Sequence, residues 1–309
     1  MQFMNKAKVC ILISCAVIVI AIIVGLFSGG LNLGIDFTGG SILTVELGET
    51  FDTQTVNAAL QANNIDPKTA QVLRSGDTQA VIRMQEMSED TDDAAVREAI
   101  VKTLKETYPN ADSGQIEHVG GATTNDIIQN AFLSVLIASG LMLLYIWVRF
   151  NLLSGIAAVL ALVHDVLIMT AFVCITRMQI NSSFIAACLT IVGYSINDTI
   201  VVFDRIRENN KKFGKTKPRH QVVDLSITET LPRTINTSLT TLITILAVYL
   251  FGVPSIKEFS LPIIVGLISG TYSSIFIASP TWTWLLEARD RHHSKKITAG
   301  KKPVKKKTK

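Results

Sequence analysis

The sequence lacks the motifs of several common enzyme classes. It has neither the HExxH of zinc proteases nor the GxSxG of serine hydrolases. Its glycine-rich stretch at 34–40 is not followed by the GK[ST] that an ATP-binding phosphate loop requires. These absences exclude those three sites, and we predict neither an enzymatic activity nor an organic or metal cofactor.

Cysteine is scarce and confined to apolar surroundings. The four cysteines are Cys10, Cys15, Cys174 and Cys188, and none lies between residues 28 and 126. No pair has the spacing of a metal site or of a disulfide framework. Oxidative folding is therefore not expected to stabilise this protein.

Charge is missing from long stretches. Six apolar runs are each long enough to cross a bilayer, at about 20 residues per span. They are Val9–Phe27, Ile127–Val148, Leu152–Ile175, Phe184–Phe203, Thr234–Val253 and Phe259–Leu286. The whole chain has 48% hydrophobic residues and a mean hydropathy of +0.38. Together, these runs and this composition predict a polytopic α-helical membrane protein. The first run exceeds a signal-peptide core and no cleavage site follows it, so we expect it to remain uncleaved.

The uneven distribution of charge predicts the orientation. Lysine and arginine gather before the first span, after the second, in the 204–233 loop and in the 289–309 tail. The positive-inside rule places these segments, and both termini, in the cytoplasm. Topology and contact with anionic membrane lipids explain the basic loop and tail, so we predict no nucleic-acid partner. The expected parts are an N-terminal span (1–28), an outer domain (29–126), a five-helix bundle (127–288) and the tail.

The outer segment has the pattern of a small α+β domain. The sequence predicts strands at Ile42–Leu47, Gln71–Arg74, Gln79–Met84 and Gln115–Val119, with helices at Thr53–Asn63 and Thr91–Tyr108. This βαββαβ order is that of a ferredoxin-like sandwich in the periplasm. Glycine pairs flank the domain and are either hinges or ordinary loop residues. The candidate hinge residues are Gly29, Gly30, Gly39, Gly40, Gly120 and Gly121.

The fourth span carries polar residues that need an explanation. Asn197 and Asp198 lie inside it, and a carboxylate at the bilayer centre costs roughly 2.5–3.5 kcal/mol. Such groups usually face a bundle interior and mark an ion path. We therefore predict that Asp198 is functional.

A polar stripe on the fifth span has matching spacing. It comprises Arg233, Asn236, Thr237, Thr240, Thr241 and Thr244, at i, i+3, i+4, i+7, i+8 and i+11. We expect Arg233 to reach Asp198, and His164 and Asp165 of the third span to complete a titratable group. The alternatives are an interfacial anchor for Arg233, backbone bonds for the threonines and a structural pair for His164 with Asp165.

Three motifs in order resemble the SecF family of bacterial protein-export membrane proteins. They are Gly34-Ile-Asp-Phe-Thr-Gly-Gly40, the stretch Val192–Asn209, and Leu231-Pro-Arg-Thr-Ile-Asn-Thr-Ser-Leu-Thr-Thr241. The resemblance spans essentially the whole chain. It implies a resistance-nodulation-division type bundle in the inner membrane that pairs with SecD, often with YajC, beside the SecYEG channel.

The resemblance also implies a function. Such proteins use protons, or sodium ions in some bacteria, to help pull an unfolded preprotein across the membrane late in export. The ion-coupling pair of the family falls on Asp198 and Arg233. Two other classes stay open at this point: a small-solute transporter subunit of the same superfamily, and an assembly factor whose polar residues are inert.

Overall fold

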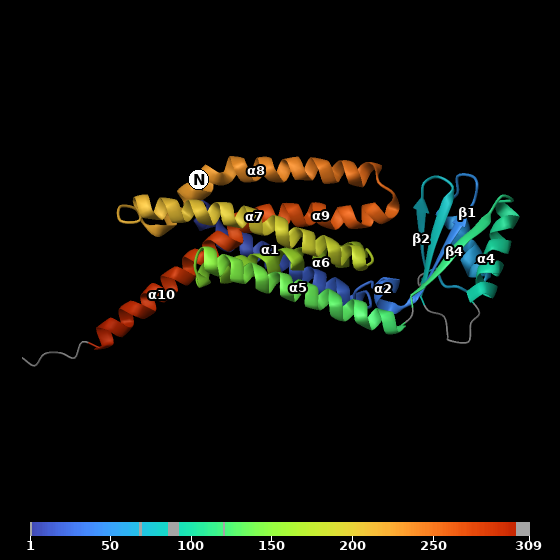
Figure 1. The fold of residues 1–309 in the computed structure, drawn as a ribbon, viewed down its shortest axis with the longest axis horizontal. Helices are drawn as coiled ribbons and strands as arrows, with labels where there is room; N and C mark the ends of the chain where they lie inside the picture. The colour runs from blue at the N-terminus through green and yellow to red at the C-terminus, as the bar shows by residue number, and fades with distance from the viewer. Residues whose placement is uncertain (1, 68–69, 86–92, 120, 301–309) are drawn as a thin grey trace, which may run out of the picture.

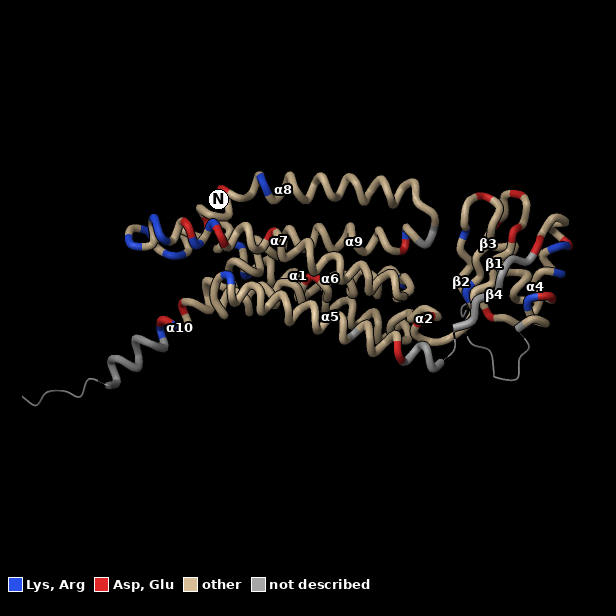
Figure 2. The backbone as a smooth tube through the Cα atoms, in the orientation of Figure 1, with Lys and Arg blue, Asp and Glu red and all other residues tan. Residues whose placement is uncertain are grey.

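The computed structural model describes residues 2–67, 70–85, 93–119 and 121–300. A long helical bundle and a small α+β domain at one of its ends make up the molecule (Figure 1). We call this the domain end of the bundle. Lysine and arginine gather at the opposite end, which we call the basic end (Figure 2).

Six helical segments are long and apolar enough to cross a membrane, as the sequence predicts. Five are single helices: α1 (Phe3–Phe27), α5 (Gly121–Arg149), α6 (Leu152–Thr176), α7 (Ser182–Phe213) and α8 (Arg219–Phe251). The sixth joins α9 (Pro254–Ser273), a π-helical turn at Ser274–Ala278 and α10 (Ser279–Gly300). The chain is thus a multi-pass membrane protein whose α7 and α9 share an extensive interface.

The segment 204–233, predicted as a loop, is helical over most of its length. Helix α7 continues to Phe213 and α8 begins at Arg219, so only a short turn separates them. Within the α7 extension, Glu208 pairs with Arg205 at 2.7 Å and with Lys212 at 2.6 Å. Because pairs at i,i+3 and i,i+4 support an exposed helix, this charge pattern favours continuation rather than a loop.

The α+β domain contains one antiparallel sheet in the order β2-β3-β1-β4. The strands are β1 (Gly40–Glu46), β2 (Ala70–Ser75), β3 (Gln79–Gln85) and β4 (Asp112–Val119), and the helices are α3 (Thr53–Ala62) and α4 (Asp93–Thr107). The βαββαβ order matches the prediction. Alternate strand residues such as Leu43, Val45 and Ile82 are buried with Leu60 and Leu104 of the helices, so these five belong to one core.

The glycine-rich stretch after α1 is fastened to the bundle. Gly34 donates its N–H to the Ile180 carbonyl at 2.8 Å, and a Cβ at this position would lie 3.2 Å from the same oxygen. Asp36, in the short helix α2 (Ile35–Thr38), accepts from the Ser182 N–H at 2.7 Å. Glycine at 34 therefore permits a close approach of two backbones.

This fastening divides the candidate hinges. Gly29 and Gly30 precede the fastened stretch, so rotation there does not move the domain against the bundle. Gly39 follows it with a φ of 77° and connects it to β1, whose first residue, Gly40 (φ 147°), is already paired with β3 and β4. Gly120 lies outside the described residues, and Gly121 begins α5. Hinge motion stays a prediction, and on the first of the two connections Gly39 is the candidate that lies between the fastened stretch and β1.

An ion pair links the domain to the bundle. Arg83 of β3 donates to Glu258 near the start of α9 at 2.9 Å, and both side chains are about 15% exposed. Asn181, the N-cap of α7, also donates to Glu258 at 2.9 Å. The domain is therefore connected directly to α9 and, through Glu258, to the start of α7. We call Arg83, Asn181 and Glu258 the domain latch.

Close packing in the bundle gives a stability prediction. A Cβ on Gly266 of α9 would clash with Ile191 and would lie 2.8 Å from the Met169 sulfur. Gly266→Ala should lower the unfolding free energy by about 1–3 kcal/mol, because the core is overpacked. Gly140→Ala is the matched control: nothing lies within 4 Å of its Cβ, so alanine should be neutral or stabilising by up to about 1 kcal/mol. Thermal unfolding in detergent measures both, and equal midpoints would contradict the packing argument.

Candidate functional site

Asp198 lies inside the bundle, as predicted. Its residue is 8% exposed on α7, and Ser238 of α8 donates to its carboxylate at 3.2 Å. The Ser238 hydroxyl also meets the Thr271 hydroxyl of α9 at 2.6 Å. One short chain of hydrogen bonds therefore connects the carboxylate with both neighbouring helices.

A small cavity adjoins this carboxylate. Its volume is about 10 Å³, close to the smallest space that holds one water molecule. Helices α7, α8 and α9 all line it, through Tyr194, Asn197, Asp198, Thr237, Thr241 and Thr271 among others. The site thus has room for a water molecule or a small ion at a carboxylate between apolar helices.

Arg233 does not pair with Asp198 in this structure. No carboxylate forms an ion pair with Arg233 in the described part of the chain, and the residue is exposed. Asn197 and Tyr194 are also exposed, on the α7 surface next to α8. The polar stripe therefore faces outward from the isolated chain, where it is open to another protein.

The stripe's threonines bond to their own helix. Thr237 donates to the Arg233 carbonyl at 2.9 Å, and Thr241 donates to the Thr237 carbonyl at 3.1 Å. Thr240 and Thr244 likewise donate to backbone carbonyls of α8. This is the backbone alternative considered above, because a hydroxyl in a helix satisfies itself on the preceding turn. Only Thr237 and Thr241 of these also line the cavity.

Asp165 occupies a separate and fully buried position. Its carboxylate accepts from Ser195 at 2.6 Å, Ser269 at 2.7 Å and Ser273 at 2.8 Å, and it contacts His164 Nδ1 at 3.0 Å. We call these four partners the Asp165 cage. They come from α6, α7 and α9, so the cage fastens three helices together.

One residue connects the two acids. Ser195 donates to Asp165, and it also lines the cavity beside Asp198 on the next turn of α7. His164 does not line that cavity: its Nδ1 contacts Asp165, and its ring stacks on Tyr272 with centroids 6.0 Å apart. The predicted group is thus two adjoining clusters, and Ser238, Ser195, Ser269 and Ser273 are functional candidates that the sequence reasoning missed.

Comparisons with known proteins identify the family. A family model described as "Protein export membrane protein SecD/SecF, C-terminal" matches residues 99–288. The chain belongs to the SecD/SecF family. A second model, "SecD/SecF GG Motif", matches residues 24–50, which contain the fastened glycine-rich stretch.

Curated relatives in the SecD/SecF family cover most of the chain. A protein translocase subunit SecF of Rickettsia bellii is 39% identical over 284 residues, covering 91% of this chain and 92% of its own length. One from Sebaldella termitidis is 36% identical, covering 82% of each chain. One from Haemophilus influenzae is 35% identical, covering 90% of this chain and 83% of its own.

Solved structures of SecD/SecF proteins share the fold but are much longer. The crystal structure of SecDF from Thermus thermophilus, a translocon-associated membrane protein, aligns with a TM-score of 0.78 and 34% identity. It covers 93% of this chain, whereas this chain spans only 39% of SecDF. A second SecDF structure, in a super-membrane-facing form, aligns with a TM-score of 0.68. More than half of a SecDF chain therefore has no counterpart in this one.

Proposed function

We propose that this protein is an accessory subunit of the Sec preprotein translocase that works with SecD. Together they would couple a proton or sodium gradient to late steps of export across the inner membrane. The observation that carries the proposal is the Asp198 carboxylate at a water-sized cavity between apolar helices. An ionisable group in that setting responds to ion binding, and the family supplies the process it would drive.

The outward-facing polar stripe supports a SecD partner. Arg233 and Asn197 are exposed in the isolated chain, on helices that cross the membrane. These polar side chains would be costly if they faced acyl chains. A second bundle would cover the stripe, and SecDF contains additional chain of sufficient length to supply one.

The contacts supply a route from the site to the α+β domain. Protonation or sodium binding at Asp198 removes or masks a charge that Ser238 contacts, and Ser238 reaches Thr271 of α9. The start of the same helix belongs to the domain latch, where Glu258 pairs with Arg83. A shift of α9 would therefore move the domain about its candidate hinge at Gly39. One charge crossing 100 mV supplies about 2.3 kcal/mol, which biases such an equilibrium without locking it.

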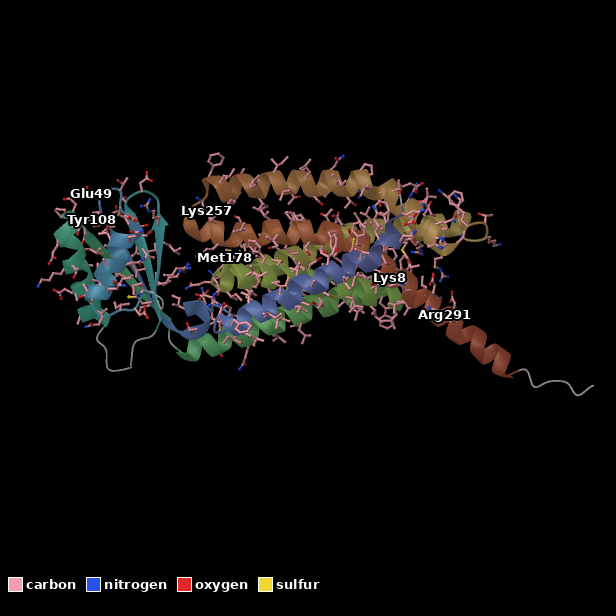
Figure 3. All side chains as sticks on the ribbon, turned by 180° about the vertical axis from the view of Figure 1, so that it is seen from behind. Lys8, Glu49, Tyr108, Met178, Lys257 and Arg291 are labelled. Atoms are coloured by element: carbon pink, nitrogen blue, oxygen red, sulfur yellow. The ribbon has the colours of Figure 1, made fainter. Side chains whose placement is uncertain are left out.

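The proposed orientation follows from charge. Basic residues gather at one end of the bundle, which supports a cytoplasmic location for that end and for both termini (Figure 2). The domain then projects from the outer face, where it would hold an unfolded preprotein emerging from SecYEG. YajC is proposed as a further neighbour, on the family resemblance alone. Lys8 and Arg291 lie toward the cytoplasmic end, and Glu49 and Tyr108 lie in the outer domain (Figure 3).

Affinity purification from native membranes tests the partnership. We expect a second multi-pass protein of the SecD type to copurify in mild detergent. An Asn236→Leu/Thr240→Leu variant should lose most of that partner, because it makes the exposed stripe apolar while leaving Asp198 untouched. The control is Leu239→Ala/Ile243→Ala, on exposed apolar positions of the same helix. A chain that purifies alone or as a homo-oligomer would contradict the proposal and favour a self-sufficient transporter.

A further inference from the structure

A cavity at the basic end of the bundle is separate from the Asp198 site. It has a volume of about 230 Å³ and shares no lining residue with the cavity beside Asp198. The turn between α5 and α6, the extended part of α7, the start of α8 and the first turns of α10 enclose it. We call it the basic-end cavity.

Three guanidinium side chains line the basic-end cavity, and they come from three helices. They are Arg207 of α7, Arg219 of α8 and Arg289 of α10, and the described residues that line it include no acidic side chain. Asp290 stands next to the cavity, paired with Arg219 at 2.9 Å and with Arg289 at 3.6 Å. These three positive charges and one negative charge leave a local balance of +2. This net positive charge favours the binding of an anion in the cavity.

Backbone groups add to this positive character. Helix α6 begins just after Asn151, and α8 begins at Arg219; both residues line the cavity. The free N–H groups at a helix start carry a partial positive charge, and phosphate oxygens commonly bind there. The start of α8 therefore adds to the three arginines, whereas at the start of α6 the Asn151 side chain already accepts from the Ser154 N–H.

A buried donor without an acceptor gives an independent indication of a ligand. Trp282 is 5% exposed and lines the cavity, and its indole N–H has no hydrogen-bond partner among the described residues. A buried donor left unpaired costs about 1–3 kcal/mol. The nitrogen is fully covered in this structure, so an oxygen atom of a bound ligand would pair with it only after neighbouring side chains move aside.

The remaining lining is apolar, with Phe150, Ile206 and Leu286 among its side chains. We propose that the basic-end cavity binds the phosphate group of an anionic ligand. Its arginines match phosphate in charge and geometry, and its apolar side chains accept a carbon-rich neighbouring part of the ligand. A phospholipid headgroup and a free phosphate compound share this chemistry; the position at the ends of the membrane-crossing helices places lipid headgroups within reach.

The test measures ligand binding by the full chain in neutral detergent. Phosphatidylglycerol, phosphatidylcholine and inorganic phosphate are titrated separately, and bound ligand is followed by native mass spectrometry and by the indole N–H signal of Trp282 in NMR. Arg207→Gln/Arg289→Gln should weaken binding about a hundredfold, at about tenfold for each charge-assisted contact. The control, Lys211→Gln/Lys212→Gln, removes equal charge from exposed positions on α7 outside the cavity.

Each outcome decides the proposal or the source of the ligand. Preferential binding of phosphatidylglycerol with a shift of the Trp282 signal supports the site with a lipid ligand. Equal binding of inorganic phosphate with the same shift supports the site with a soluble ligand. Equal weakening in both variant pairs, or binding that leaves the Trp282 signal unmoved, overturns the proposal. Trp282→Phe keeps an aromatic ring but loses the donor together with the pyrrole part of the indole, and it checks the site if the arginine variant unfolds.

Discussion

Asp198→Asn is expected to abolish the gradient-stimulated part of preprotein export while leaving ATP-driven export intact. Asparagine has nearly the same shape and still accepts the hydrogen bond from Ser238, so the packing around the cavity is preserved. It cannot gain or lose a proton, and it binds a cation far more weakly than a carboxylate. Completion of export in inverted vesicles, with and without an imposed gradient, measures the effect, and we expect the stimulation to fall at least tenfold.

The control for this substitution is on the same helix. Asp204→Asn changes an exposed carboxylate, 45% accessible, whose ion-pair partner among the described residues is Arg149. It should retain the stimulation, because an exposed pair contributes little and lies outside the cavity. If export in Asp198→Asn is stimulated by the gradient as in the unsubstituted protein, the coupling role is refuted. If both variants lose the gradient stimulation equally, the effect is one of acidic residues in general and not of Asp198.

Asp165→Ala is expected to destabilise the bundle more than any other single change considered. The substitution leaves the Ser195, Ser269 and Ser273 hydroxyls and the His164 ring without their shared acceptor, in a site with no solvent access. Breaking a buried charged network in this way costs about 3–5 kcal/mol. Thermal unfolding of the full chain in detergent should therefore show a clearly lowered midpoint.

Two further variants separate the network from ordinary buried hydroxyls. Ser260→Ala removes a fully buried hydroxyl that donates only to the Ile256 carbonyl on its own helix, so its cost should be about 1 kcal/mol or less. Asp165→Asn retains an acceptor oxygen, so its unfolding midpoint should lie between those of Asp165→Ala and Ser260→Ala. A midpoint for Asp165→Ala equal to that of Ser260→Ala would mean that the cage does not hold the three helices together.

The spans and the domain topology could be predicted because each depends on local patterns. An uncharged run of about 20 residues has few alternatives to a membrane helix, and alternating β-branched residues such as those of Ile42–Leu47 indicate a strand. The ends of α7 and α8 at the basic end of the bundle are harder to predict from the sequence. The apolar pattern stops where the helix leaves the membrane, but the helix itself can continue beyond that point. There the Glu208 and Lys212 spacing was the relevant signal, and it indicates helix.

The sequence predicts which residues of α8 share a face, but not which residues of the neighbouring helices they contact. Spacing along α8 places Arg233 and the threonines on one face, but it does not say which face meets α7. The threonines satisfy themselves on the backbone, so Ser238, outside the stripe, became the partner of Asp198. The serines around Asp165 come from two other helices. Ser269 and Ser273, one turn apart beside Gly266 and Gly270, formed a small polar face that pointed to this packing.

The most direct test of the central claim is to watch the domain move when the gradient is imposed. Energy transfer between dyes at Glu49 of the domain and Phe251 at the domain end of α8 is recorded in vesicles, with the protein reconstituted beside its partner and the four native cysteines replaced. The account predicts that a gradient shifts the distance distribution in the unsubstituted protein and leaves it unchanged in Asp198→Asn. The same shift in both proteins would contradict it.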